Sequence, residues 1–248
     1  MYVYNAVLRD SIISEINDKK YSDKDAVILS RMCDQMRKAS SYNFRYLTEI
    51  DQLDTSGLGD IMKEYVCKFE TQYIKAVLLF KMACDKTKGC DELAIELYSQ
   101  FKASDNYIQK PNAPAPCGIY VRYDNVFNKL KPKRFKRELI ELAKNPLDVV
   151  YLPFTMRMLA SWKIPEIKDI FVSYSKGTGI TKEVFGIKDN EADQERFYYQ
   201  KREMVFAVID VLKYYPIDEC IAIIEKYSTS DDKDIASAAQ NALKKMLK

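Results

Sequence analysis

The sequence predicts an all-α protein made of stacked antiparallel helix pairs. Three observations lead to this fold class. Only 7 of the 248 residues are glycine, too few for the many tight turns of a β-sandwich or a β-barrel. Apolar residues recur at helical spacing over most of the chain, and segments that alternate strictly between apolar and polar residues, as half-buried strands do, are scarce.

The N-terminal region is predicted to be helical because apolar residues keep to single stripes there. The second of its helices has Ser22 or Asp23 as its N-cap, since either side chain can accept a backbone N–H bond. Asp60 is expected to cap a long helix, and Asp91 begins a shorter one. The predicted helices cover residues 7–16, 26–36, 60–86 and 91–101.

A proline-rich segment interrupts this pattern at residues 104–118. It carries Pro111, Pro114 and Pro116, and proline both lacks the N–H that a helix needs and holds the preceding residue extended. We therefore expect an irregular crossover there. The resulting division is an N-terminal helical region (1–103), the crossover (104–118) and helical repeats (119–248), unless the two regions form one continuous domain.

The C-terminal region is predicted to contain seven helices. Its single tryptophan, Trp162, is expected in the core between helix pairs, together with the nearby aromatic residues Tyr151, Phe154, Phe171 and Tyr174. The predicted helices are Tyr123–Leu130, Lys133–Lys144, Leu147–Ser161, Pro165–Ser175, Gln194–Lys213, Ile217–Tyr227 and Lys233–Met246.

This region also contains a loose internal repeat. A helix ending in an aromatic residue, a proline turn and a helix ending in Tyr-Ser occur at residues 154–175 and again at 206–228, an offset of 52 residues at the first aromatic. The last helix carries Asp-Ile-Ala-Ser-Ala-Ala-Gln-Asn-Ala-Leu, from Asp234 to Leu243. This segment resembles the second helix of a HEAT-like (armadillo-type) repeat, and the resemblance covers about residues 135–248.

The resemblance implies an α-solenoid, a curved stack of helix pairs that presents one surface to a macromolecular partner. HEAT units usually have about 40–47 residues, so the repeat in this chain is longer. The excess falls in residues 174–193, which we expect to form a loop between units.

The composition excludes several kinds of chemistry. The chain has no histidine, which removes Ser-His and Cys-His nucleophile pairs and His-ligated zinc or haem. Its six cysteines show no Cys-x-x-Cys spacing and are expected to be reduced structural thiols. We predict no catalytic residue, no metal site and no cofactor. The longest apolar run, residues 76–80, is too short to cross a membrane, and a cytoplasmic location is predicted.

Two further patterns have both a functional and a structural interpretation. Residues 175–179, Ser-Lys-Gly-Thr-Gly, are reminiscent of a phosphate loop but lack its full spacing, and a plain loop is favoured. Glu191, Asp193 and Glu195 could bind a cation, but carboxylates are also favoured at the start of a helix, and that interpretation is preferred.

The strongest charge feature is the basic segment, residues 129–137, with six basic residues and no acid. It is either a solvated helix start whose charges are neutralised by nearby acids or a site for an anionic partner. Adjacent tyrosines must expose at least one ring, and tyrosine is favoured at interfaces. The candidate binding residues, expected together on one curved surface, are Lys133, Arg134, Lys136, Arg137, Lys168, Lys176, Tyr198 and Tyr199.

These features predict a non-enzymatic protein–protein interaction module or scaffold whose partner is an acidic protein. Nucleic-acid binding, including a HEAT-like DNA base-excision enzyme, ranks second: such enzymes use Trp, Asp and Arg in a basic channel, whereas this chain has one tryptophan and a net charge of +3. An enzyme using paired carboxylates ranks third, because no spacing singles out a pair. The oligomeric state is left open.

Overall fold

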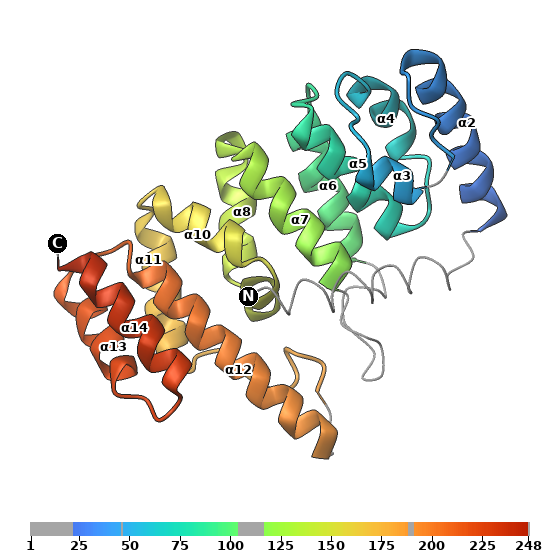
Figure 1. Ribbon diagram of the computed structural model, residues 1–248. Helices are drawn as coiled ribbons and strands as arrows, with labels where there is room; N and C mark the ends of the chain where they lie inside the picture. The colour runs from blue at the N-terminus through green and yellow to red at the C-terminus, as the bar shows by residue number, and fades with distance from the viewer. Residues whose placement is uncertain (1–21, 46, 104–116, 188–190, 248) are drawn as a thin grey trace. The chain divides into compact units, whose positions relative to one another are not determined.

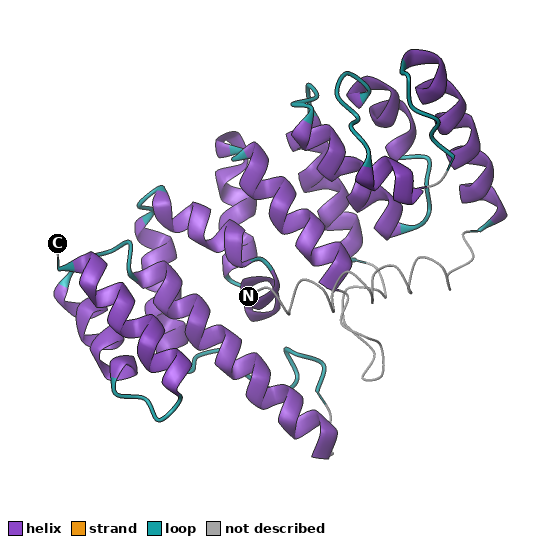
Figure 2. Ribbon diagram, in the orientation of Figure 1, coloured by secondary structure: helices purple, strands orange, loops and turns teal. Residues whose placement is uncertain are grey.

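The computed structural model describes residues 22–45, 47–103, 117–187 and 191–247. Over these ranges every regular element is a helix, 13 α-helices and one short 3-10 helix, and there is no strand (Figure 2). The predicted all-α fold is confirmed for this part of the chain. The predicted helix over residues 7–16 and most of the predicted crossover, residues 104–116, lie outside the described residues.

The described residues form two compact units. Unit 1 contains residues 22–103 and 117–130, and unit 2 contains residues 131–247. The helices of unit 1 (Figure 1) are α2 (Asp23–Ala39), α3 (Leu47–Gln52), α4 (Gly59–Val66), α5 (Gln72–Cys84), α6 (Cys90–Lys102) and α7 (Cys117–Leu130).

Helix α5 is the centre of unit 1. It packs against α3, α4, α6 and α7, and each residue from Ile74 to Leu79 is buried. A helix that is apolar nearly all round is stable only where neighbours cover every face, and the four surrounding helices provide that cover.

An aromatic cluster joins α6 to α7. The rings of Tyr98 and Tyr123 lie 4.9 Å apart and those of Phe101 and Tyr120 lie 5.1 Å apart, each pair in an edge-on arrangement that favours contact between the positive edge and negative face of two rings. These contacts place α7 in unit 1, whereas the predicted C-terminal region began at residue 119.

The prediction of one long helix over residues 60–86 is wrong, because this segment is two helices, α4 and α5. The break comes from a residue far away in the sequence. The Asp25 carboxylate accepts the backbone N–H groups of Glu70 and Thr71, at 2.8 and 2.9 Å, and so holds the chain in a turn where the local apolar pattern alone would continue the helix. The predicted cap Ser22 is confirmed, since its hydroxyl accepts the N–H of Asp25.

The helices of unit 2 begin with η1, a 3-10 helix that leads directly into α8. The prediction of one helix over residues 147–161 is wrong: α9 ends at Tyr151 and α10 begins at Pro153, because proline disfavours helical backbone in the residue before it. The elements are η1 (Lys133–Phe135), α8 (Lys136–Ala143), α9 (Pro146–Tyr151), α10 (Pro153–Ser161), α11 (Pro165–Ser175), α12 (Glu191–Leu212), α13 (Asp218–Ser228) and α14 (Lys233–Met246).

The helices of unit 2 make two sets of contacts. Helix α11 packs against both α8 and α13, and α12 packs against α9, α10 and α14 (Figure 1). Buried tyrosine hydroxyls tie successive parts together: Tyr174 donates to the carbonyl of Ala143 at 2.9 Å and Tyr215 to that of Ile164 at 2.8 Å. The Ala143 carbonyl lies at the C-terminus of α8, where helix geometry leaves carbonyls without an intrahelical partner. The Ile164 carbonyl is at the N-cap of α11 and also accepts the backbone N–H of Ile167.

The aromatic residues predicted in the core of unit 2 are divided between core and surface. Phe171 and Tyr174 are buried, but Trp162 and Tyr151 are only half-buried and Phe154 is exposed. The expectation for Phe154 was therefore wrong. Its ring lies 4.6 Å from the guanidinium of Arg157, one turn further along α10, so a cation rather than the core covers it.

Within the described residues no helix is long and apolar enough to cross a membrane.

Candidate interaction surface

The two halves of α12 have different surroundings. The second half lies in the core of unit 2, with Met204, Val208 and Leu212 buried. Among residues 194–203 of the first half, none is buried, and Figure 1 shows this half extending past the end of α14. The sequence explains the difference, because the helical stripe of apolar residues begins only at Met204.

One side of this first half packs against other parts of unit 2. The ring of Phe197 lies 6.3 Å from that of the buried Phe185, in the loop before α12. Gln200 donates a side-chain hydrogen bond of 3.1 Å to the hydroxyl of Tyr151 on α9. These contacts fix the rotation of α12 about its axis and therefore decide which residues point outward.

Tyr198 and Tyr199 are the exposed aromatic residues of this half. They are 60% and 53% exposed, and their ring centroids lie 6.0 Å apart in an edge-on arrangement. Arg202 follows at three and four positions along, so it lies on the same face of the helix as both tyrosines. We call these three residues the tyrosine face.

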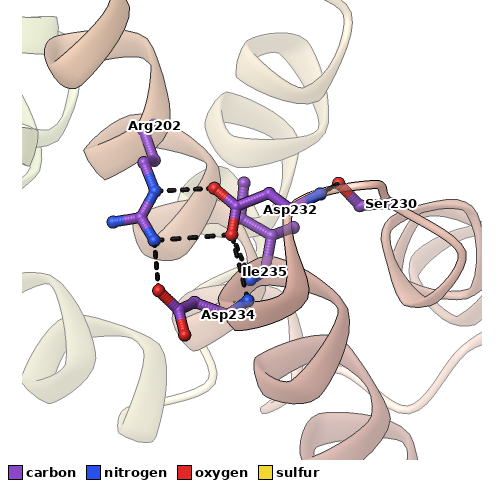
Figure 3. A network of polar contacts seen from close by, with 5 residues as sticks. All are labelled: Arg202, Ser230, Asp232, Asp234 and Ile235. Carbon is purple, nitrogen blue, oxygen red and sulfur yellow. Dashed lines mark hydrogen bonds and ion pairs between the residues drawn. The ribbon is translucent and has the colours of Figure 1, made fainter.

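Arg202 connects this face to α14 (Figure 3). Its Nε lies 2.6 Å from Oδ2 of Asp232, and its Nη2 lies 2.6 Å from Oδ2 of Asp234. Asp232 is also the N-cap of α14, accepting the backbone N–H of Asp234 at 3.0 Å and of Ile235 at 3.2 Å. A single carboxylate thus begins one helix and anchors another, which holds the exposed half of α12 in place.

The hydrogen bond from Arg202 lowers the pKa of Asp232 below its ordinary value. A lowered pKa means that the charged form is favoured by folding, so this pair stabilises the protein above the ordinary aspartate pKa of about 3.9 and loses its effect as the pH falls through the folded-state value.

We expect the thermal midpoint of Asp232→Asn to lie below that of the unmodified protein near neutral pH, with a gap that narrows as the pH falls to about 3. Asparagine is itself a good N-cap, so the substitution removes the charge and keeps the cap. Melting curves over this pH range provide the measurement, with the more exposed Asp234→Asn as the comparison. A gap independent of pH would show that the ion pair with Arg202 contributes nothing.

The basic candidates lie elsewhere in unit 2. Lys133 and Arg134 belong to η1 and Lys136 and Arg137 to the first turn of α8, and all four are exposed. Helix α8 packs against α9, α10 and α11, and Figure 1 shows it well apart from the first half of α12. The structure therefore brings Tyr198 and Tyr199 together and brings the four basic residues together, but it separates the two groups.

The remaining two basic candidates, Lys168 and Lys176, belong to α11 and to its C-cap. Lys168 on α11 lies 2.8 Å from a carboxylate oxygen of Asp169 and 4.0 Å from one of Glu219 on α13. It therefore neutralises acids of its own unit. Lys176 is exposed at the C-cap of α11.

The glycine-containing loop at residues 175–179 closes a helix. Gly177 has φ of +81°, its N–H bonds to the carbonyl of Tyr174, and the N–H of Thr178 bonds to that of Ser173. This pairing is a Schellman motif, in which glycine adopts the left-handed backbone at a helix C-terminus. Carbonyl groups and the negative end of the helix dipole face this loop, the opposite of what a phosphate requires.

Acidic and thiol groups form no metal site in the part of the chain that the structure describes. The side chains of Glu191 and Asp193 lie outside the described set, and Glu195 is exposed on α12. Three cysteines, Cys33, Cys90 and Cys220, are buried free thiols, and burial raises the pKa of the Cys33 thiol to about 11 and that of Cys90 to about 12. Neutral thiols are poor nucleophiles and poor metal ligands.

No protein-family model, curated protein or solved structure matches this chain. Its function is therefore inferred from the residues of the chain itself.

The sequence indicates both tyrosines but not the network that positions them. Asp232 carries a local signal, because an aspartate directly before an apolar helical stripe is a typical N-cap. Its partner Arg202 is 30 residues earlier in the sequence, and no local pattern links the two.

Proposed function

We propose that this protein is a non-enzymatic interaction module and that unit 2 binds a protein partner through the tyrosine face of α12. The observation that supports this function is the pair of adjacent tyrosines, each more than half exposed, on a part of α12 where residues 194–203 include no buried side chain.

Covering the two exposed rings with a partner removes apolar surface from water. Tyrosine presents a large apolar ring with few rotatable bonds, so its burial in an interface loses little conformational entropy. Its hydroxyl keeps a polar group available at the rim. Arg202, the third residue of the face, is held by Asp232 and Asp234, so the surface is largely ordered before any partner arrives.

We also propose that unit 2 is a short α-solenoid of the HEAT-like kind. Its support is the two sets of helix contacts, with α11 between α8 and α13, and α12 between α10 and α14. The bonds from Tyr174 and Tyr215 add to this, because each joins a helix or turn to the preceding part of the stack. In such a stack one row of helices lines a continuous face that suits a macromolecular partner.

A reducing, cytoplasmic location belongs to the same proposal. It is supported by the five cysteines whose side chains the structure describes, since Cys33, Cys67, Cys84, Cys90 and Cys220 are all free thiols.

We expect the double variant Tyr198→Ala/Tyr199→Ala to bind its protein partner about thirtyfold more weakly than the unmodified chain, because the two rings together are expected to contribute about 2 kcal/mol, the level of a binding hot spot. The immobilised chain is used to recover proteins from lysate of its source cells, and affinity is then measured with the purified partner. The matched control is Tyr42→Ala, which removes a tyrosine that is 41% exposed in unit 1.

The control should recover the same partner as the unmodified chain. If the double variant and the unmodified chain recover the same proteins with equal affinity, the tyrosine face is not the binding site.

A further inference from the structure

A positively charged surface, separate from the tyrosine face, lies at the start of unit 2. We call it the basic cluster, and its members are Lys131, Lys133, Arg134, Lys136 and Arg137. Five cations within seven residues are all exposed. The surface stands apart from the tyrosine face, so the role proposed for α12 does not account for it.

Several cations elsewhere in unit 2 are matched by acids of the same unit. Lys144 pairs with Glu141 and Glu166, Lys168 with Asp169 and Glu219, and Arg202 with Asp232 and Asp234. By contrast, within the described residues no ion pair is found for Lys131, Lys133, Lys136 or Arg137. Positive charge is therefore concentrated at one place in a protein whose net charge is only +3.

The position of these cations opposes the stability of the helix that carries them. Lys136 and Arg137 are in the first turn of α8, where the helix dipole favours anions and disfavours cations. Within the cluster Lys133 makes an aromatic contact, since its Nζ lies 5.9 Å from the centroid of the Trp162 ring. The fold thus orders the cluster and gains no helix stability from its charge.

The extent of the cluster limits what it can bind. From Lys131 to Arg137 the backbone rises on the order of 15 Å. The outer surface of α8 then becomes acidic, with Glu138 and Glu141 exposed. A nucleic-acid strand, with one phosphate about every 3.4 Å along a duplex, would continue past the cluster onto these acids. A short acidic peptide meets only the cations.

We propose that the basic cluster binds a short acidic segment of a protein, at a site separate from the tyrosine face. Carboxylates of the segment lie against the lysine and arginine head groups and balance the cations at the start of α8. The interaction is electrostatic, so it is fast and weakens with salt. This inference does not depend on the proposed role of Tyr198 and Tyr199.

The test measures fluorescence anisotropy of a labelled glutamate-rich octapeptide titrated with the full chain at low salt. The charge-reversal variant is Lys133→Glu/Arg134→Glu/Lys136→Glu/Arg137→Glu. The matched control reverses four exposed lysines of α13 and α14, Lys226, Lys233, Lys244 and Lys245, and so changes the net charge by the same amount. Short and long oligothymidylates serve as competing probes.

We expect the cluster variant to bind the peptide at least about tenfold more weakly, the control to bind within about threefold of the unmodified chain, and Tyr198→Ala/Tyr199→Ala to bind normally. The thermal midpoint of the cluster variant should not fall, because glutamates at the start of α8 suit the helix dipole. If the cluster charge-reversal variant fails to fold, the milder variant Lys136→Gln/Arg137→Gln is expected to give a smaller loss of peptide binding in the same assay.

Three results would overturn the proposal. One is equal weakening in the cluster and control variants, which would indicate a response to net charge alone. Another is unchanged peptide binding in the folded cluster variants. The third is tighter binding of oligothymidylate than of peptide, with affinity that rises with strand length, which would assign the cluster to nucleic acid.

Discussion

Replacing Asp25 by alanine is expected to lower the free energy of unfolding by about 3 kcal/mol, because a buried charge-assisted network loses its acceptor. Asp25 is fully buried, and its carboxylate accepts three bonds: the N–H groups of Glu70 and Thr71 and the Thr71 hydroxyl, the last at 2.5 Å. Truncation leaves two backbone donors without an acceptor at the turn between α4 and α5.

Urea unfolding followed by circular dichroism provides the measurement. The matched control is Asp23→Ala, which removes an exposed carboxylate from the same first turn of α2 and loses only a favourable interaction with the helix dipole. Asp25→Asn retains one acceptor oxygen, so its loss of unfolding free energy should lie between those of Asp25→Ala and Asp23→Ala. Similar losses for Asp25→Ala and Asp23→Ala would mean that the buried bonds do not hold the α4–α5 turn.

A methyl group at position 59 is expected to cost about 2–3 kcal/mol, through overpacking. A Cβ at Gly59 would lie 1.8 Å from Oγ1 of Thr87 and 2.5 Å from Oδ2 of Asp85. The site cannot relax easily, because the same Asp85 carboxylate accepts the N–H groups of Gly57 at 2.8 Å and Gly59 at 2.9 Å. Moving the carboxylate would break both bonds.

Two comparisons isolate the clash for Gly59→Ala. Oγ1 of Thr87 has no hydrogen-bond partner among the described residues, so Thr87→Ala should be nearly neutral and should recover part of the loss. Gly57 has φ of +79°, and a methyl group there would have no atom within 4 Å, so Gly57→Ala should cost only the left-handed backbone strain, about 1 kcal/mol. Thermal or urea unfolding of the single and double variants measures these stability differences. If the stability loss of Gly59→Ala is unaffected by Thr87→Ala, the steric explanation is contradicted.

Local signals predicted most helices of unit 2 closely. Helices Pro165–Ser175 and Lys233–Met246 have the boundaries expected from the sequence, because each has a start signal within its own few residues: proline in the first turn for one, and the capping Asp232 for the other. The prediction at Pro153 was wrong although the signal was present, since the apolar stripe continues across the proline and dominated the interpretation.

For the candidate surfaces too, the sequence indicates local features but not the contacts between distant residues. Exposure of tyrosine follows from the sequence, since adjacent tyrosines cannot both face the core of one helix. The sequence could not show that the first half of α12 is held by Tyr151 and by Asp232, which contact Gln200 and Arg202 across 49 and 30 residues. It also offered no reason to separate the basic residues from the tyrosines.

The sequence by itself determined the helical class of the described residues, most helix boundaries in unit 2 and the concentration of charge in the basic segment. All three depend on residues within one or two helical turns of each other, where spacing along the chain is also spacing in space. Tertiary structure alone decided the break between α4 and α5, the assignment of α7 to unit 1 and the separation of the two candidate surfaces. Each of these depends on contacts such as that of Asp25 with Thr71, 46 residues apart, and a local pattern contains no information about partners at that distance.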